Sequence, residues 1–161
     1  MTWDSHHSTR LFDEDFGVPD AVVSTLANLN VTLNLHHDGV PVVRWEENAA
    51  LTAFFALLST NFDRNGAAFA STLEAWNYPF TGTQWHPERN QFEWRNNNAD
   101  HSADGVTAMQ YMSNFFVGDA RRNLQTFNDT ALFARLSIYS YPWVNAADSV
   151  TSGVQWIVAD L

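Results

Sequence analysis

The chain has 161 residues, of which 45% are hydrophobic and 14% aromatic, and its 18 acidic and 8 basic side chains give it a formal charge of -10. A chain of this length can bury roughly 68 to 70% of the surface that it exposes when unfolded, which favours one globular domain over a disordered chain. The negative charge disfavours nucleic-acid binding, and no apolar run is long enough to span a bilayer, so we expect neither nucleic acid nor a membrane as partner.

The sequence contains no cysteine, which excludes disulfides, thiolate metal sites and thiol catalysis by the chain itself. Its first residues lack the basic start and apolar stretch of a signal peptide, so we expect any secretory leader to lie outside this chain. Two triplets, Asn30-Val31-Thr32 and Asn128-Asp129-Thr130, fit the N-glycosylation pattern. They are weak evidence for a secretory compartment, because such triplets arise often by chance.

In chain order, the first clear element is a helix predicted over residues 49–58. Asn48 can cap it, and its apolar face would be formed by Leu51, Phe54, Phe55 and Leu58. Residues 63–66 then read Asp-Arg-Asn-Gly, a turn signal in which Asn and Gly both tolerate a positive φ. A strand is predicted over residues 68–74, so the turn indicates a hairpin or a tight strand connection.

Residues 78–85 predict another strand, rich in aromatic residues and threonine, in which Gly82 would allow a close approach by another group. A longer helix is predicted over residues 102–123, with Arg121 and Arg122 at its negative end. Its buried side would be formed by Val106, Met109, Met112, Phe115 and Phe116. Residues 138–141 and 154–158 form two β-like runs in the tail, and nothing in the sequence indicates a second domain.

The motif that carries chemistry is His86-Pro87-Glu88, directly after the second predicted strand. On an extended backbone, residues two apart project to the same side about 6.6 Å apart, and proline pushes the residue before it toward that conformation. A carboxylate that accepts from one imidazole nitrogen fixes the tautomer and leaves the other nitrogen free to take a proton from a nucleophile. The pair therefore resembles two thirds of a catalytic triad.

Two simpler interpretations of His86 and Glu88 stand beside this one. Taken alone, a histidine next to an acidic residue in a turn is more often a surface pair than a catalytic one. A zinc site is the weaker alternative, because the pair supplies only two of the three or four protein ligands that such a site needs.

The longer string around the motif favours catalysis. Residues 78–94 read YPFTGTQWHPERNQFEW, which resembles the strand and turn that carry the histidine and glutamate of γ-glutamyl hydrolases, relatives of the class I glutamine amidotransferases. The order and spacing of residues 58–61 (LSTN), 71–75 (STLEA), 115–117 (FFV) and 138–139 (IY) continue the likeness. The resemblance covers most of the chain and is specific to the γ-glutamyl hydrolases in its Phe-Glu-Trp at residues 92–94.

This resemblance implies an α/β fold, in which residues 1–161 form the C-terminal part of a three-layer sandwich of the class I glutamine amidotransferase, or flavodoxin-like, type. It implies that His86 and Glu88 are catalytic, and that the cysteine and the oxyanion hole belong to an upstream half that this chain does not contain. We therefore expect the chain to be inactive alone. Half of such a sheet would also expose an edge strand and an uncovered apolar face.

The implied reaction is hydrolysis of γ-glutamyl bonds in folyl or antifolyl poly-γ-glutamates, with no cofactor and no metal. Residues 7–12 resemble a family segment that contains a histidine lining the substrate pocket. Because this chain has one extra residue there, either His6 or His7 takes that place, and we favour His7 as the substrate-binding residue. His36 and His37 are assigned no role. The family's compartments imply a lysosomal, vacuolar or extracellular protein, and we allow for a homodimer.

Two other functions remain open. A non-catalytic binding module, or pseudoenzyme, would keep the pocket wall without the nucleophile. The glutaminase part of an amidotransferase would use the same turn to release ammonia from glutamine, but that class channels ammonia to a synthase, and no synthase sequence follows Leu161.

Overall fold

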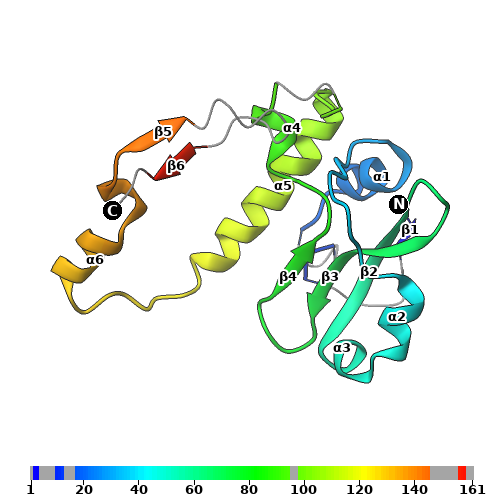
Figure 1. The fold of residues 1–161 in the computed structure, drawn as a ribbon, viewed down its shortest axis with the longest axis horizontal. Helices are drawn as coiled ribbons and strands as arrows, with labels where there is room; N and C mark the ends of the chain where they lie inside the picture. The colour runs from blue at the N-terminus through cyan, green and yellow to red at the C-terminus, as the bar shows by residue number, and fades with distance from the viewer. Residues whose placement is uncertain (1, 4–9, 13–16, 95–97, 146–155, 159–161) are drawn as a thin grey trace.

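The computed structural model describes residues 2–3, 10–12, 17–94, 98–145 and 156–158. Over these ranges the chain is a mixed α/β structure with two regions (Figure 1). We call the described residues up to Met112 the lobe, and those from Ser113 onward the arm. The lobe holds the sheet and the motif at His86, whereas the arm extends away from it (Figure 1).

The lobe is built around a four-stranded antiparallel sheet with the strand order β1-β2-β3-β4. Its strands are β1 (Thr2–Trp3), β2 (Phe55–Phe62), β3 (Ala68–Ala75) and β4 (Thr81–Thr83). The pairing of β2 with β3 shifts register on either side of Ser59, which is a β-bulge. The α/β class expected from the sequence is confirmed, and the sheet in the described residues is small and antiparallel.

The helix predicted over residues 49–58 is only half right. Asn48 does cap α3 (Ala49–Phe54), because its side-chain oxygen accepts hydrogen bonds from the N–H groups of Ala50 and Leu51, both at 3.1 Å. The helix ends at Phe54, and the following residues form β2 instead. Pairing with β3 buries Ala56 and Leu58, so long-range sheet formation outweighs the helical spacing of the local apolar residues.

The predicted hairpin is confirmed between β2 and β3. The carboxylate of Asp63 accepts hydrogen bonds from the N–H groups of Asn65 and Ala67, each at 2.8 Å. Gly66 takes a positive φ of 82°, whereas Asn65 does not, so only one of the two tolerant residues uses that freedom. The strand predicted over residues 68–74 corresponds to β3.

The strand predicted over residues 78–85 is reduced to β4. The residues before it form the connection from β3, closed by a hydrogen bond from the N–H of Ala75 to the carbonyl of Phe80 at 2.8 Å. Gly82 does permit a close approach, because a Cβ there would lie 3.2 Å from the side chain of Leu73. Gln84 continues the pairing by donating its N–H to the carbonyl of Ser71 at 2.8 Å.

The lobe also contains α1 (Asp20–Asn28), α2 (Val42–Glu47), α4 (Arg89–Phe92) and the first part of α5 (Ala103–Ala120). The predicted long helix is confirmed as α5, and Ser102 caps it by accepting from the N–H of Gly105 at 3.1 Å. Helix α1, strand β2 and helix α5 meet in the main core, whose buried members are Leu11, Val18, Val22, Leu26, Val31, Ala56, Leu58, Trp85, Ala108, Met109 and Met112.

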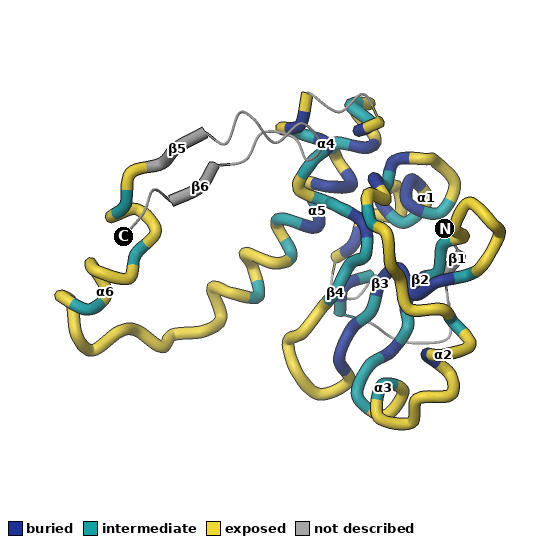
Figure 2. Tube along the Cα trace, in the orientation of Figure 1, coloured by how far each residue is buried: buried dark blue, intermediate teal, exposed yellow. Residues whose placement is uncertain are grey.

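The predicted buried side of α5 fails at Phe116, which is 69% exposed. Val106 and Phe115 are half-buried, and only Met109 and Met112 of the predicted set are buried. The core reaches only the first half of the helix, and the second half belongs to the arm (Figure 2).

The arm continues through α6 (Thr130–Leu136), a 3-10 helix η2 (Ile138–Ser140), and an antiparallel pair of β5 (Trp143–Asn145) and β6 (Trp156–Val158). The β-like run predicted at residues 138–141 is wrong, because Ser137 accepts from the N–H of Tyr139 and begins a turn of helix. The run at residues 154–158 does contain β6, whose partner is β5. No helix in the described part of the chain combines the length and the apolar character needed to cross a bilayer.

Candidate active site

Trp85 anchors the strand end that leads to the candidate site. Its side chain is 2% exposed and belongs to the main core, and its indole Nε1–H donates to Oγ1 of Thr72 on β3 at 3.0 Å. The next residue, His86, donates its backbone N–H to the carbonyl of Leu33 at 3.1 Å. The backbone that carries the imidazole is therefore tied both to the sheet and to a separate segment.

His86 and Glu88 meet as the sequence predicts, with Nδ1 of the imidazole 2.8 Å from Oε1 of the carboxylate. The route differs from the prediction. Glu88 has helical angles, with φ -78° and ψ -14°, and is the N-cap of α4. The pair therefore closes across a turn rather than along an extended strand.

The two side chains differ in their exposure to solvent. The His86 side chain is 32% exposed and that of Glu88 is 64% exposed. Within the described residues, Nε2 of His86 has no hydrogen-bond partner. The carboxylate therefore occupies one ring nitrogen and leaves the other available to a reacting group.

Arg89 and Asn90 are two residues of this turn for which the sequence pattern predicts no individual role. Nε of Arg89 lies 3.6 Å from the same oxygen, Oε1 of Glu88, that contacts His86, and the Arg89 side chain is mostly buried. Asn90 is fully buried at the start of α4. The sequence shows only that two polar residues directly follow the motif. Nothing in the pattern indicates that the asparagine is buried rather than exposed.

The other histidines do not join this pair in the described residues. His7, the predicted substrate-binding residue, and its alternative His6 lie outside the described residues. The ring of His36 contacts the carbonyl of Asp38 at 2.8 Å and Oδ1 of Asn34 at 3.2 Å. The described residues contain no group of three or more His, Asp or Glu side chains that could hold a metal ion.

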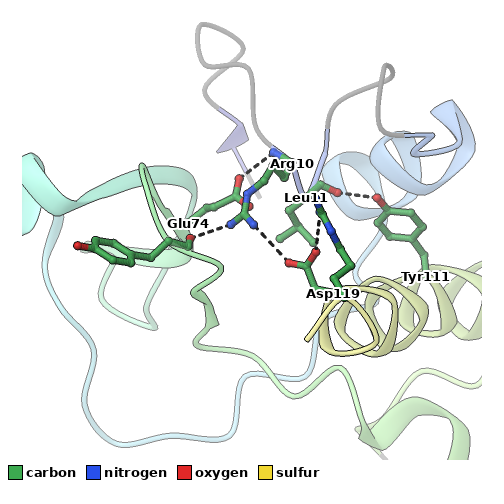
Figure 3. A network of polar contacts seen from close by, with 7 residues as sticks. Arg10, Leu11, Glu74, Tyr111 and Asp119 are labelled. Atoms are coloured by element: carbon green, nitrogen blue, oxygen red, sulfur yellow. Dashed lines mark hydrogen bonds and ion pairs between the residues drawn. The ribbon is translucent and has the colours of Figure 1, made fainter. Parts of the chain in front are cut away.

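A second polar cluster lies near the far end of β3 and centres on Arg10 (Figure 3). Its backbone N–H donates to Oε2 of Glu74 at 2.9 Å, and its Nη1 donates to Asp119 of α5 at 3.3 Å. Its Nη2 lies 3.0 Å from Oε1 of Glu74 but is oriented to donate to the carbonyl of Tyr78 at 2.9 Å. The contact with Oε1 is therefore an ion pair rather than a hydrogen bond, consistent with the lack of any hydrogen bond to that oxygen.

This cluster perturbs two titratable groups. Burial raises the pKa of the Glu74 carboxyl, although the Arg10 guanidinium and the backbone N–H groups of Arg10 and Leu11 act in the opposite direction. Burial also raises the pKa of the Tyr111 hydroxyl, and the charge of Glu74 adds to that shift. Tyr111 donates to the carbonyl of Leu11 at 2.7 Å (Figure 3). The cluster ties the N-terminal segment to the sheet and to α5, and none of its contacts involves His86 or Glu88.

A pocket of about 500 Å³ lies beside the same cluster, at the connection between β3 and β4. Its lining includes Arg10, Trp76, Tyr78 and Asp119 but neither His86 nor Glu88. Because β3 and β4 are antiparallel, this connection and the His86 turn lie at opposite ends of the hairpin. The pocket is therefore separate from the candidate catalytic pair.

No protein-family model matches the chain. Comparison with curated proteins finds relatives that are named γ-glutamyl hydrolases. The chain is 39% identical over 124 residues to γ-glutamyl hydrolase B of Dictyostelium discoideum, which is 76% of this chain and 36% of that protein. It is 33% identical over 123 residues to γ-glutamyl hydrolase 1 of Arabidopsis thaliana, covering 76% and 35%. Against the γ-glutamyl hydrolase of Homo sapiens it is 34% identical over 124 residues, covering 76% and 39%.

The resemblance indicated by residues 78–94 is thus confirmed over three quarters of the chain. The chain spans little more than a third of the length of the curated relatives that it matches. By sequence, this chain is a homologue of the γ-glutamyl hydrolases that corresponds to one part of their length.

Proposed function

We propose that this chain is part of a γ-glutamyl hydrolase, in which His86 is the general base and Glu88 orients it for hydrolysis of folate poly-γ-glutamates. The observation that carries the proposal is the 2.8 Å contact between Nδ1 of His86 and Oε1 of Glu88. A carboxylate accepts a hydrogen bond and cannot donate one when ionised, so it stabilises the tautomer with the proton on Nδ1. The lone pair is then on Nε2, where a nucleophile can deliver its proton.

The reaction in this proposal uses a cysteine that the chain itself does not contain. The thiol gives its proton to Nε2 of His86, and the thiolate attacks the γ-carbonyl carbon. When the tetrahedral intermediate collapses, the C–N bond breaks, the imidazolium returns the proton to the leaving amine, and a thioester remains. Water then loses a proton to Nε2 and attacks the thioester. The C–S bond breaks, the imidazolium returns its proton to the sulfur, and the γ-carboxylic acid that is released ionises in water. In both halves Glu88 stabilises the charge on the imidazolium.

The proposal extends to the fold of the whole enzyme. We place the β1–β4 sheet and its helices in the C-terminal part of a three-layer sandwich of the class I glutamine amidotransferase type, with residues 1–161 as one partial domain. The exposed apolar side chains of the arm support this placement, because a layer in the remainder of such a domain would cover them. The strand end before His86 supports it as well, because it brings the base to the edge of a sheet.

The substrate and the compartment are also part of the proposal. We propose a folyl or antifolyl poly-γ-glutamate as substrate, a lysosomal, vacuolar or extracellular location, and no nucleic-acid or membrane partner. Asn30 and Asn128, the two asparagines of the glycosylation triplets, are both exposed, which supports a secretory route. A homodimer would be compatible with this function.

One observation favours a second candidate. Because the chain has no cysteine, a protein consisting of this chain alone could bind a γ-glutamyl compound but could not form the thioester. Incubating the purified chain with folate pentaglutamate separates the two functions. Saturable binding without release of glutamate, by a chain that is stable on its own, would favour a non-catalytic binding module.

The direct test joins this chain to the portion of the Dictyostelium enzyme that it does not match, and measures glutamate release from folate pentaglutamate by mass spectrometry. We expect the fusion protein to hydrolyse the substrate. Because general acid–base catalysis contributes about 100-fold to 10,000-fold, His86→Ala should lower kcat by that factor. Glu88→Gln should lower kcat too, because it removes the charge that stabilises the imidazolium.

His37→Ala is the matched control, since it removes an exposed imidazole that has no assigned role. It should leave hydrolysis unchanged. Equal loss of activity in His37→Ala and His86→Ala would show that the assay reports folding rather than catalysis. Full activity in His86→Ala would remove the assignment of the base.

A further inference from the structure

The turn that carries the catalytic pair is attached at both of its ends to one segment of the chain. At one end, the backbone N–H of His86 donates to the carbonyl of Leu33 at 3.1 Å. At the other end, the side-chain Nδ2 of Asn90 donates to the carbonyl of Val31 at 2.9 Å. Both accepting residues are buried, so the segment provides a fixed support, and Glu88 lies between the two attachments.

Asn90 also connects this turn to the residues that precede α5. The same Nδ2 donates to the carbonyl of Asp100 at 2.8 Å, and Nδ1 of His101 lies 2.7 Å from the backbone carbonyl of Asn90. Both partners of the amide nitrogen are carbonyl oxygens, which only accept hydrogen bonds. The orientation of the amide is therefore unambiguous, since its oxygen could not replace the nitrogen at either contact.

The other contacts of the turn lie at α4 and its neighbours in α5, where the Gln91 side chain donates to Gln110 at 3.1 Å. Helix α4 has only four residues, and Asn90 is its only buried residue. The hydrogen bond from the N–H of Arg89 to the carbonyl of His86 is long, at 3.4 Å. Glu88 is largely exposed, so its carboxylate is positioned by the backbone and by the ion pair with Arg89 rather than by packing. Release of the Asn90 side chain would remove the attachments to Val31 and Asp100. The backbone N–H of His86, the contact of His101 with the Asn90 carbonyl and the bonds of Gln91 to α5 would remain.

We infer that Asn90 is a positioning residue for the His86–Glu88 pair: its amide clamps the far end of the turn, which keeps Oε1 of Glu88 within hydrogen-bonding distance of Nδ1 of His86. Asn90 itself is fully buried and acts through the turn rather than on the reacting atoms. The inference takes the catalytic meaning of the pair from the proposed function, but the clamp is a property of this chain. It acts by selecting the imidazole tautomer.

The test measures the tautomer of His86 in the purified chain by long-range ¹H–¹⁵N NMR at a pH where an ordinary histidine is neutral. In the wild type we expect the proton mainly on Nδ1, as the contact with Glu88 requires. Asn90→Ala should lower the ratio of the Nδ1–H to the Nε2–H form about tenfold, which is the equilibrium effect of losing one charge-assisted hydrogen bond. Asn90→Ser keeps one hydroxyl donor, which is too short to reach the carbonyls of both Val31 and Asp100, so it should give an intermediate tautomer ratio. This variant provides the measurement if Asn90→Ala does not fold.

Tyr111→Phe is the matched control, because it also removes a hydrogen bond to the carbonyl of a distant residue but leaves the turn untouched. It should lower the melting temperature without changing the tautomer ratio of His86. An unchanged ratio in the folded Asn90 variants would overturn the inference, and so would an equal change in Tyr111→Phe. Because the ratio is read without turnover, this result is independent of whether the fusion protein hydrolyses folate pentaglutamate.

Discussion

The lobe and the arm share helix α5, which carries a stripe of apolar residues along one face. The stripe is buried in the lobe and exposed in the arm. Met109 and Phe116 are seven residues apart, which is about two helical turns, so they lie on the same face. Met109 is 0% exposed and Phe116 is 69% exposed. The helical spacing of apolar residues continues from the lobe into the arm. Only the lobe provides a core against which these residues can pack.

The rest of the arm shows the same mismatch. None of residues 113–142 is buried, although this part of the arm is rich in large apolar side chains. Its exposed members are Phe116, Val117, Leu124, Phe127, Phe133, Leu136, Ile138 and Tyr139. Full burial of one such side chain stabilises a protein by about 1.5 to 3 kcal/mol, and exposed apolar clusters mark interaction surfaces. The difference teaches that apolar burial within this chain accounts for the lobe, whereas the described part of the arm leaves its apolar side chains exposed.

The largest expected effect lies on the buried half of the shared stripe. Met109→Ala removes a fully buried side chain from the core between α1, β2 and α5. We expect it to lower the free energy of unfolding by about 2 to 5 kcal/mol. The variant loses the free energy of transferring the buried atoms out of water, and the cavity that remains adds a further cost. Urea denaturation followed by tryptophan fluorescence measures it. A loss below about 1 kcal/mol would mean that the lobe is no better packed than the arm, since such small losses are typical of surface sites.

The free energy of unfolding should depend on pH through Glu74, which pairs with Arg10 where Arg10 joins the sheet to Asp119 of α5. Because the pKa of Glu74 is raised above its ordinary value of 4.5, the folded state holds this proton more tightly than the unfolded state. The contribution of Glu74 to stability is complete below pH 4.5 and is lost as the pH rises through its folded pKa. The loss cannot be steeper than about 1.4 kcal/mol per pH unit, which is the limit for one proton.

Glu74→Gln isolates this contribution from that of the other carboxylates. The difference in unfolding free energy between the wild type and Glu74→Gln should change in favour of the variant as the pH rises above 4.5. Urea titrations at a series of pH values provide the comparison. Parallel curves for the wild type and Glu74→Gln would contradict the assigned direction.

A smaller effect is expected at the cap of α3, inside the lobe but near its surface. Asn48→Ala removes the oxygen that accepts from the N–H groups of Ala50 and Leu51. The cost should be about 1 kcal/mol, as for other N-caps, and Asn48→Asp should restore most of it. Equal stability of the alanine variant and the wild type would show that α3 adds little to the lobe.

These elements also show what sequence reasoning can reach. The Asn48 cap, the turn at Gly66, the long helix α5 and the meeting of His86 with Glu88 follow from local rules of capping, turn chemistry and short spacing. Local rules failed where distant contacts decide. Phe55 and Leu58 follow helical spacing but lie in β2, which pairs with β3. Asn90 is buried where the carbonyls of the distant residues Val31 and Asp100 accept from its amide. The prediction that Phe116 is buried was wrong for the opposite reason. The helical spacing of apolar residues includes Phe116, but no described part of the chain packs over it.

The smallest expected effect lies on the exposed half of the shared stripe, and it sharpens the comparison most. Phe116→Ala should change the free energy of unfolding of this chain by no more than about 0.5 kcal/mol, as for other surface positions. In the fusion protein with the remainder of the Dictyostelium enzyme, the same substitution should cost about 3 to 5 kcal/mol, because Phe116 would then be part of a core. Urea denaturation of both proteins gives the two values. A small effect in both would mean that the arm stays uncovered even in the longer protein, and the lobe would then be the only part of this chain that depends on apolar burial.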